Sequence, residues 1–397
     1  MEYRISNKMK DMKPSAIREI FKSLSDPSII SFAAGNPSPL SFPVKELAEI
    51  SADIYSSDAV NALQYSITEG YPPLRRAVEE RLRDKFNICD ERDITIITSG
   101  GQQGIELACK ALCNEGDVVL CEDPTFIGGL NSFRSCGAKT VGVPLEDDGI
   151  DPDVLDKMLT EIPNVRLLYL IPTFQNPGGI TTSLEKRKKI YETAVRHGVM
   201  ILEDNPYGEL RFNGEDIPTL KSMDTEGIVL YSSSFSKILS SGMRLGYLCG
   251  PEPVVQKMVV AKQAEDVHSN IYFQMLTYRF MTEYDLDGHI AKIRELYRSK
   301  CELMLKTLDE YMPEGIKYTR PDGGLFIWVT LPEKIEMSAY VQRCLEKKVA
   351  VVPGNTFLCN TEDRINSVRI NYSTPSDEEI VAGCKAMAEA AAEMLAE

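Results

Sequence analysis

The 397-residue chain contains few residues of the kinds on which metalloenzymes and many hydrolases depend. Its three histidines, His197, His268 and His289, do not form an HExxH-like motif, which argues against a catalytic zinc or a Ser-His-Asp hydrolase. Its ten cysteines include no CxxC pair, so we expect reduced packing residues and no metal site. The nucleotide-binding motifs GxGxxG and GxxxxGK[ST] are also absent.

The chain lacks an excess of positive charge and any long apolar run. Lys and Arg number 44 against 59 Asp and Glu, giving a formal net charge of −15, which argues against general affinity for nucleic acid or anionic membranes. No run of about 18 apolar residues is present, so we expect no membrane span. The first residues contain no apolar signal-peptide core, so we expect a cytoplasmic protein.

Between about residues 70 and 265, short apolar runs alternate with amphipathic stretches. Stretches such as 101–113 and 182–197 have helical periodicity. The apolar runs predict strands at 93–98, 117–123, 138–145, 165–172, 198–204, 227–233 and 245–250. This alternation predicts an α/β fold with a mostly parallel, seven-stranded central sheet.

The C-terminal part has a different pattern, which is typical of a smaller α+β domain. Residues 285–310 predict one long helix, and 324–331 and 367–373 predict strands separated by a helix. We expect the polar N-terminal segment, residues 1–50, to pack with this small domain. The predicted division is then a large domain at 51–284 and a small domain at 285–397.

Polar clusters follow several predicted strands at their carboxyl ends, where ligands bind in open α/β sheets. They are SGGQQG (99–104), TFQNPGG (173–179), Glu203-Asp204 and YSSSFSK (231–237). Each cluster has an ordinary explanation, such as turn glycines, a capping or ion-paired aspartate, or a polar loop with a solvated lysine. Because the strand ends lie at one edge of the sheet, a single shared site explains them together.

One half of such a site suits a phosphate monoester. Gly101 and Gln102 open a helix whose first N–H groups are free to bind an anion. The hydroxyls of Ser234 and Ser236 and the guanidinium of Arg244 supply further donors.

The other half of the site suits a cationic heterocycle that carries an aldehyde. Pyridoxal phosphate contains both this heterocycle and a phosphate monoester. The carboxylate of Asp204 suits a protonated pyridine nitrogen, and Lys237 suits an aldehyde that forms a Schiff base. Asn176 and Tyr207 are placed to contact the ring hydroxyl, and Phe126 to stack on the ring.

Motifs along almost the whole chain carry a resemblance to a known family. They include SAIREIF (15–21), SFAAGNP (31–37), LQYSITEGYPPLR (63–75), TSGGQQGIEL (98–107), EDPTF (122–126), PTFQNPGG (172–179), EDNPYGEL (203–210), SSSFSKILSSGMRLGY (232–247), PDGGLFIW (321–328), PGNTF (353–357) and VRINYS (368–373). On these motifs the chain resembles the class I/II aminotransferases of fold type I, in the group that includes 2-aminoadipate and kynurenine aminotransferases.

The resemblance implies a pyridoxal-phosphate enzyme that moves an amino group between an L-amino acid and a 2-oxo acid by a ping-pong mechanism, with glutamate and 2-oxoglutarate as one pair. Lys237 would be the Schiff-base lysine and proton carrier, and Arg369 would clamp the substrate α-carboxylate beside Asn176. Gly35 would form part of the substrate wall. Many relatives have serine where Gly101 stands, so one hydroxyl contact to the phosphate is missing here.

The resemblance also implies a homodimer with shared active sites, in which Tyr65 reaches the phosphate bound by the neighbouring subunit. Arg18 would meet the side-chain carboxylate of dicarboxylic substrates and move away for aromatic or aliphatic ones. On pattern alone, Arg18 could equally be a solvated helix residue. A broad enzyme is therefore expected, with aminoadipate, aromatic or aliphatic amino acids as the partners of glutamate.

Two other functions remain compatible with the shared motifs. A carbon–sulfur β-lyase would use the same fold and cofactor, and a non-catalytic pyridoxal-phosphate sensor would bind ligand without turnover. Some proteins fuse this fold to a winged helix-turn-helix, which binds DNA. In this chain the residues before SAIREIF are too few for that module, so we expect no nucleic-acid partner.

Overall fold

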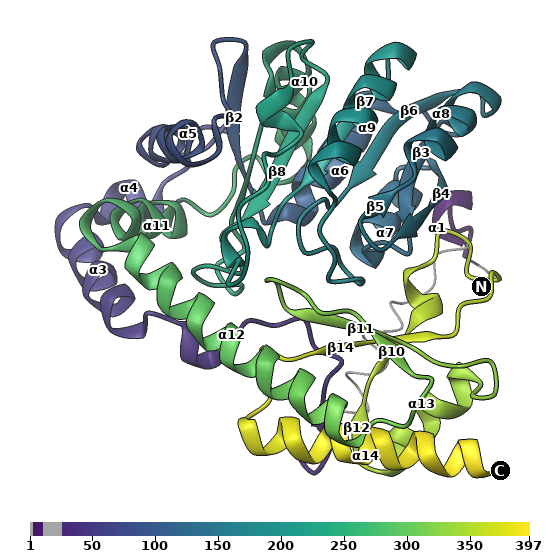
Figure 1. Cartoon of the computed structure of the whole chain (residues 1–397). Helices are drawn as coiled ribbons and strands as arrows, with labels where there is room; N and C mark the ends of the chain where they lie inside the picture. The colour runs from purple at the N-terminus through teal and green to yellow at the C-terminus, as the bar shows by residue number, and fades with distance from the viewer. Residues whose placement is uncertain (1–2, 11–25) are drawn as a thin grey trace.

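The central element of the fold is an eight-stranded mixed sheet with helices on both faces (Figure 1). The structure is a computed structural model, which describes residues 3–10 and 26–397. The strand order of the sheet is β2-β9-β8-β7-β6-β3-β4-β5. The strands are β2 (Asp93–Thr98), β3 (Val118–Asp123), β4 (Lys139–Glu146), β5 (Gly149–Ile150), β6 (Val165–Leu170), β7 (Met200–Asp204), β8 (Val229–Ser234) and β9 (Gly246–Pro251). Neighbours from β8 to β4 pair in parallel, whereas β9 runs antiparallel to both of its neighbours.

The α/β prediction is confirmed, but the number of strands was wrong by one. All seven predicted runs form strands, and β5 adds an eighth that pairs antiparallel with β4. Gly149 has a φ of 110°, which lets the chain reverse directly after β4. A strand of two residues is too short for alternation to reveal it in the sequence.

Alternating side chains of the strands bind helices to the two faces of the sheet. On β6, Leu167 and Tyr169 point into the core that includes α6 (Gly101–Leu112) and α7 (Ile127–Ser135). Leu168 and Leu170 point into a second core that includes α8 (Pro152–Glu161) and α9 (Leu184–His197). Both faces of these strands are therefore buried, as the near-continuous apolar runs predict.

Local signals in the sequence fix the ends of the helices that surround the sheet. At α9 the Ser183 hydroxyl accepts the N–H of Lys186, and Gly198 ends the helix with a φ of 65°. The remaining helices of this half are α3 (Val44–Ser57), α4 (Ala59–Leu63), α5 (Pro72–Phe86), α10 (Glu252–Glu265) and α11 (Ile271–Glu283), and a short α1 (Asn7–Lys10) lies beside α7 (Figure 1).

A second, four-stranded sheet forms the lower part of the molecule in Figure 1. Its order is β10 (Lys317–Tyr318), β11 (Phe326–Thr330), β14 (Ser367–Asn371) and β13 (Val352–Pro353). The helices α12 (Leu286–Tyr311), α13 (Met337–Glu346) and α14 (Asp377–Ala396) accompany it, and α12 runs from the upper half to pack along α14. Near the N-terminus of the chain, β1 (Ile30–Ser31) pairs in parallel with β12 (Val349–Ala350). The boundaries at residues 50 and 285 stay a proposal.

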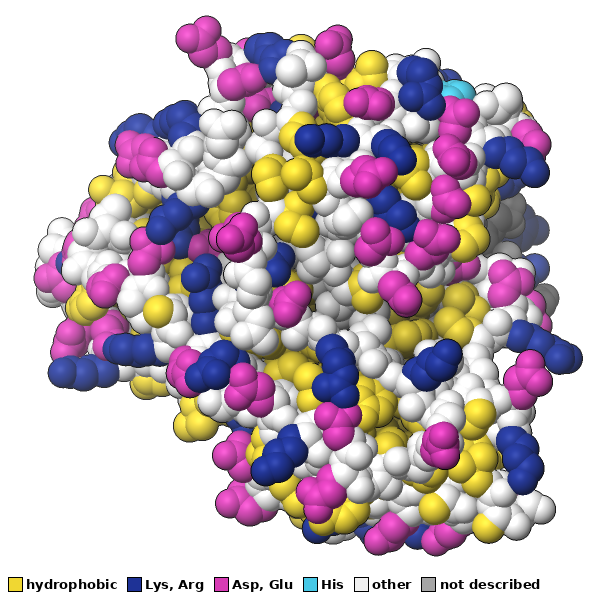
Figure 2. All heavy atoms as spheres, in the orientation of Figure 1, with side chains coloured by type: hydrophobic (Ala, Val, Ile, Leu, Met, Phe, Trp, Pro, Cys, Tyr) yellow, Lys and Arg dark blue, Asp and Glu magenta, His cyan; other side chains and the backbone are white. Residues whose placement is uncertain are grey.

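Acidic and basic side chains are interspersed over the face shown in Figure 2, and apolar side chains show in the hollow between the upper and lower parts. None of the helices in the described part of the chain has the length and apolar character needed to cross a membrane.

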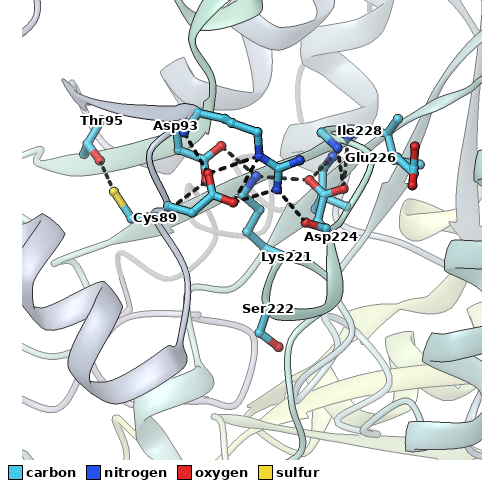
Figure 3. Close-up of polar contacts among 12 residues, drawn as sticks. Cys89, Asp93, Thr95, Lys221, Ser222, Asp224, Glu226 and Ile228 are labelled. Atoms are coloured by element: carbon cyan, nitrogen blue, oxygen red, sulfur yellow. Dashed lines mark hydrogen bonds and ion pairs between the residues drawn. The ribbon is translucent and has the colours of Figure 1, made fainter.

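A buried charge cluster ties β2 to the loop before β8, at the amino ends of the strands (Figure 3). The Lys221 amino group lies 2.8 Å from Asp93 Oδ1 and 3.1 Å from Asp224 Oδ2, and all three side chains are almost fully buried. Asp224 also accepts backbone N–H groups, among them that of Val229 at 3.0 Å. Burial raises the pKa of Asp93, and the nearby ammonium of Lys221 opposes that rise.

Replacing Lys221 by methionine should lower the free energy of unfolding by about 3–5 kcal/mol, because two buried carboxylates lose the one cation that pairs with both of them among the described residues. Urea denaturation of the two proteins measures the difference. The control is Lys45→Met, since Lys45 is 84% exposed and lies 4.0 Å from Glu49, and its effect should stay within about 0.5 kcal/mol. Equal stabilities for Lys221→Met and the wild type would contradict the role given to this cluster.

Candidate active site

A cavity of about 280 Å³ lies where β7 and β8 end and α6 begins. Twelve of the fourteen residues predicted for the site line it, and these are Gly35, Gly101, Gln102, Phe126, Asn176, Asp204, Tyr207, Ser234, Ser236, Lys237, Arg244 and Arg369. Of the other two, Tyr65 does not line the cavity, and Arg18 lies outside the described residues.

Lys237 follows β8 and brings its amino group into this cavity. Its Nζ donates to the carbonyl of Gly35 at 2.8 Å and lies 5.9 Å from the ring centroid of Tyr207. Burial of the amino group lowers the pKa of Lys237 to about 8, and the positive charges of Arg369 and Arg244 act in the same direction. A useful fraction of this amine is therefore neutral, and so nucleophilic, near neutral pH.

Asp204 ends β7 and is 4% exposed. Its Oδ2 accepts a hydrogen bond from the Tyr169 hydroxyl at 2.8 Å, and no cation pairs with it within the described residues. Burial raises the pKa of Asp204 to about 7, and the Tyr169 hydroxyl opposes that rise. Tyr169 was not among the predicted site residues. A tyrosine in the otherwise aliphatic end of VRLLYL was the available signal, because a buried hydroxyl needs a partner.

Without bound cofactor, Asp204→Asn should stabilise the protein more at pH 8 than at pH 5.5. At pH 8 the Asp204 carboxylate is ionised and buried without a cation, and the loss of stability is complete. At pH 5.5, between its ordinary pKa of 3.8 and its native pKa of about 7, it is protonated in the native state and only part of that stability is lost. A native pKa above the unfolded value makes the native state lose stability as pH rises through that window. Thermal denaturation of both proteins at the two pH values measures this, and an equal shift at both would contradict the raised pKa.

The phosphate end of the predicted site has the expected donors. Gly100, at the start of α6, has a φ of 82°, and a Cβ there would collide with the guanidinium of Arg244, so that guanidinium lies over the helix N-terminus. The side-chain amide of Gln102 donates to α7, at the carbonyl of Gly128 (2.6 Å) and the hydroxyl of Ser132 (2.5 Å). Gln102 therefore offers its backbone N–H to the cavity rather than its amide.

Ser234 and Ser236 form a hydroxyl pair at the same end of the cavity. Their oxygens lie 2.8 Å apart, and the N–H of Ser236 donates to Ser234 Oγ at 3.0 Å. Gly101 places no side chain here, and a Cβ at that position would lie 3.9 Å from Ser234 Cβ. Because Gly101 stands where many relatives have serine, it leaves space next to the two serines instead of a third hydroxyl.

Arg369, on β14, brings a guanidinium to the cavity from the smaller sheet. It is 2% exposed, its Nη1 donates to Asn176 Oδ1 at 2.9 Å and its Nη2 to the carbonyl of Ala33 at 2.8 Å. The rings of Phe326 and Phe357 lie 4.2 and 4.9 Å from the guanidinium carbon. Burial lowers the pKa of Arg369 to about 10.

The hydrogen-bonding capacity of Arg369 is not fully used. Its Nε has no partner although it is buried, and no described carboxylate pairs with it. Such a group in a cavity wall is suited to an anionic ligand, because its unpaired N–H is costly until something accepts it.

Tyr65 lies on the surface, next to α4, and its side chain is 81% exposed. Its ring meets the ring of His268 edge-on at 5.9 Å. Other large apolar side chains of the same region are also exposed, namely Tyr55, Val60, Leu63 and Ile67. Several large apolar side chains exposed in one region of the chain are typical of a protein–protein contact.

The residues of the cavity fit pyridoxal phosphate. Donors for a phosphate gather at the α6 N-terminus, and the cavity also receives one oxygen of Asp204, which no described residue pairs. Lys237 supplies an amine of lowered pKa within the same cavity. The anion site, the carboxylate and the amine are the three groups that this cofactor needs.

Comparison with known proteins agrees with this arrangement. The family description "Aminotransferase class I and II" matches residues 27–387. The chain is 38% identical to aromatic-amino-acid aminotransferase 1 of Thermococcus litoralis, covering 98% of this chain and 94% of that one.

Two solved structures are also similar over nearly their full lengths. Kynurenine aminotransferase of Pyrococcus horikoshii, solved with PMP, is 37% identical with a TM-score of 0.95, covering 98% of this chain and 97% of that one. The α-aminoadipate aminotransferase of Thermus thermophilus, solved with N-(5'-phosphopyridoxyl)-L-leucine, is 36% identical with a TM-score of 0.90, covering 99% and 98%.

Proposed function

The chain belongs to the class I and II aminotransferases, which use pyridoxal phosphate, and on that premise we propose how its residues divide the work of transamination. When bound, pyridoxal phosphate supplies an aldehyde that condenses with amines and a protonated ring that accepts the electron pair released at the substrate α-carbon. The protein's residues hold that group, orient the amino acid and move one proton.

Two sets of residues hold the cofactor. Ser234, Ser236, Arg244 and the first N–H groups of α6 bind its phosphate. Asp204 would pair with the ring nitrogen, Asn176 and Tyr207 would contact the ring oxygen, and Phe126 would stack on the ring, since all four line the cavity.

Arg369 and Lys237 act on the amino acid. Arg369 binds the α-carboxylate through its unpaired Nε–H, with Asn176 beside it, and Gly35 lines the substrate. Lys237 takes the proton from the α-carbon and delivers it to the cofactor side, and in the second half of the ping-pong cycle it works in reverse. One observation carries this proposal: an amine of lowered pKa and a carboxylate-free guanidinium face the same cavity.

The substrates we propose are glutamate with 2-oxoglutarate as one pair, and aminoadipate, aromatic or aliphatic amino acids as the other partner. The support is the set of similar enzymes, whose names specify aromatic amino acids, kynurenine and α-aminoadipate. A cytoplasmic location stays a prediction.

A panel of amino acids assayed with and without 2-oxoglutarate tests this proposal. Transamination predicts 2-oxo acid product only when the acceptor is present. Pyruvate, free thiol and ammonia formed from a cysteine conjugate without acceptor would favour the β-lyase alternative. Ligand binding with no conversion of the cofactor would favour a sensor.

We also propose a homodimer in which Tyr65 completes the neighbouring subunit's phosphate site. This assembly is supported by the exposed apolar side chains in the region of Tyr65, and by the absence of Tyr65 from the lining of its own chain's cavity. Light scattering should give twice the chain mass of 44.4 kDa. Leu63→Asp, which places a charge on this surface, should shift the protein towards the monomer and weaken cofactor binding together, and a monomeric wild type with full activity would contradict the proposal.

A further inference from the structure

The cofactor's expected carboxylate partner is itself held by a residue for which no role has been assigned. Tyr169 lies on β6, next to β7, and pairs in register with Leu202. Side chains two residues apart on a strand point to the same face, so Leu202 and Asp204 share the face on which the Tyr169 ring lies. The hydroxyl therefore reaches diagonally along the sheet to Asp204 Oδ2, at 2.8 Å.

The ring of Tyr169 is fixed from the side of the helices. It is fully buried and meets Phe133 of α7 edge-on, with ring centroids 5.3 Å apart and an angle of 71° between the planes. One turn earlier on α7, a Cβ at Gly129 would come within 2.8 Å of the ring and 3.2 Å of the hydroxyl oxygen. The glycine thus lets α7 close directly over the tyrosine, and the ring has little freedom to move.

The two oxygens of Asp204 have different surroundings. Tyr169 is the one described side chain that hydrogen-bonds to this carboxylate, and it uses Oδ2. Oδ1 points towards the start of α6, 4.0 Å from where a Cβ on Gly101 would lie, and Asp204 lines the cavity. Burial keeps the pKa of Tyr169 well above its usual value, so the hydroxyl stays protonated and can only stabilise the ionised carboxylate as a donor.

We propose that Tyr169 is a positioning residue for transamination, whose hydroxyl holds the Asp204 carboxylate in one orientation and leaves Oδ1 for the ring nitrogen of pyridoxal phosphate. The inference rests on the proposed role of Asp204. We infer that the contact between β6 and α7, made by Tyr169, Phe133 and Gly129, serves to hold the Asp204 carboxylate in place.

The test compares two tyrosine-to-phenylalanine variants that differ in which polar group loses its partner. Tyr169→Phe removes the donor to Asp204, whereas Tyr231→Phe, on β8, removes an equally buried hydroxyl that accepts from Asn205 Nδ2 at 3.0 Å. Both keep the ring and its packing. For each, fluorescence titration of the protein freed of cofactor gives the dissociation constant for pyridoxal phosphate, and steady-state kinetics give kcat and KM.

Tyr169→Phe should raise the dissociation constant for pyridoxal phosphate roughly 10- to 100-fold, because a hydrogen bond to a charged group is lost. It should lower kcat by about tenfold and leave KM for the amino acid within about twofold, since Tyr169 does not meet the substrate. Tyr231→Phe should stay within about twofold of the wild type in all three quantities.

A double-mutant cycle separates positioning from general packing. In an Asp204→Asn background, Tyr169→Phe should change cofactor affinity by less than about threefold, because the charge that it supports is gone. The inference is overturned if Tyr169→Phe binds the cofactor as the wild type does, costs the same in both backgrounds, or loses no more than Tyr231→Phe. A wild-type protein that binds no pyridoxal phosphate would instead overturn the proposed function itself.

Discussion

Replacing Lys237 by alanine should lower kcat for transamination by at least about 10⁴-fold, the upper range for a positioned acid–base group. Lys237 holds the one amine that lines the cavity among the described residues, and its lowered pKa, about 8, suits it to accept and return a proton near neutral pH. Without it, the described lining holds no other amine to carry a proton from the α-carbon. Steady-state kinetics with glutamate as donor measure the loss.

Two comparisons make the Lys237 result specific. Lys334→Ala removes an exposed lysine whose Nζ donates to the carbonyl of Leu395, away from the cavity, and it should keep activity within about twofold. The Lys237→Ala protein should also unfold at a temperature close to that of the wild type, because the buried amine that is removed has a carbonyl partner but no ion-pair partner among the described residues. Multiple turnovers at the wild-type rate in Lys237→Ala would show that the assignment is wrong.

Replacing Arg369 by alanine should lower kcat/KM for amino acids and 2-oxo acids by roughly 10²- to 10³-fold, the cost of removing one partner from a buried charge pair. The reason is that Arg369 is 2% exposed and its buried Nε–H has no partner, so water competes little with a substrate carboxylate for this hydrogen bond. The measurement is kcat/KM for phenylalanine and for phenethylamine, which lacks the carboxylate. The preference of the wild type for phenylalanine should collapse in the variant.

The matched control for this charge is Arg320→Ala, since Arg320 is 58% exposed and pairs with Asp309 away from the cavity. It should leave both substrates within about twofold of the wild type. An equal loss on the amine and the amino acid in Arg369→Ala would mean that Arg369 shapes the site without binding the carboxylate.

The positions of Asp204 and Lys237 could be predicted from sequence because of one property of parallel sheets. Strands that run in the same direction end at the same edge, so polar residues after consecutive apolar runs must meet there. To predict the position of each of these residues, it is enough to recognise the strand that precedes it. The family resemblance then added Arg369 and Gly35, which come from segments whose place beside the sheet no local pattern reveals.

The features that escaped prediction depend on contacts between segments far apart in the chain. Tyr169 reads as one more core aromatic until the β6–β7 register places it beside Asp204. The partners of the Gln102 side-chain amide could not be predicted either, because its two acceptors, the Gly128 carbonyl and the Ser132 hydroxyl, come from α7. The Lys221 cluster joins residues 128 positions apart, and periodicity carries no information about such a pairing.

The central claim is that the chain is an aminotransferase whose Lys237 lies at the cofactor, and one absorbance experiment tests it most directly. The purified protein, loaded with pyridoxal phosphate, is mixed with glutamate in the absence of any acceptor. We predict that the cofactor's absorbance band disappears with release of one 2-oxo acid per site, and that adding a second 2-oxo acid restores it. In Lys237→Ala the same exchange should be lost or far slower. An unchanged band in a cofactor-loaded wild type that is given its whole panel of amino acids would contradict the account.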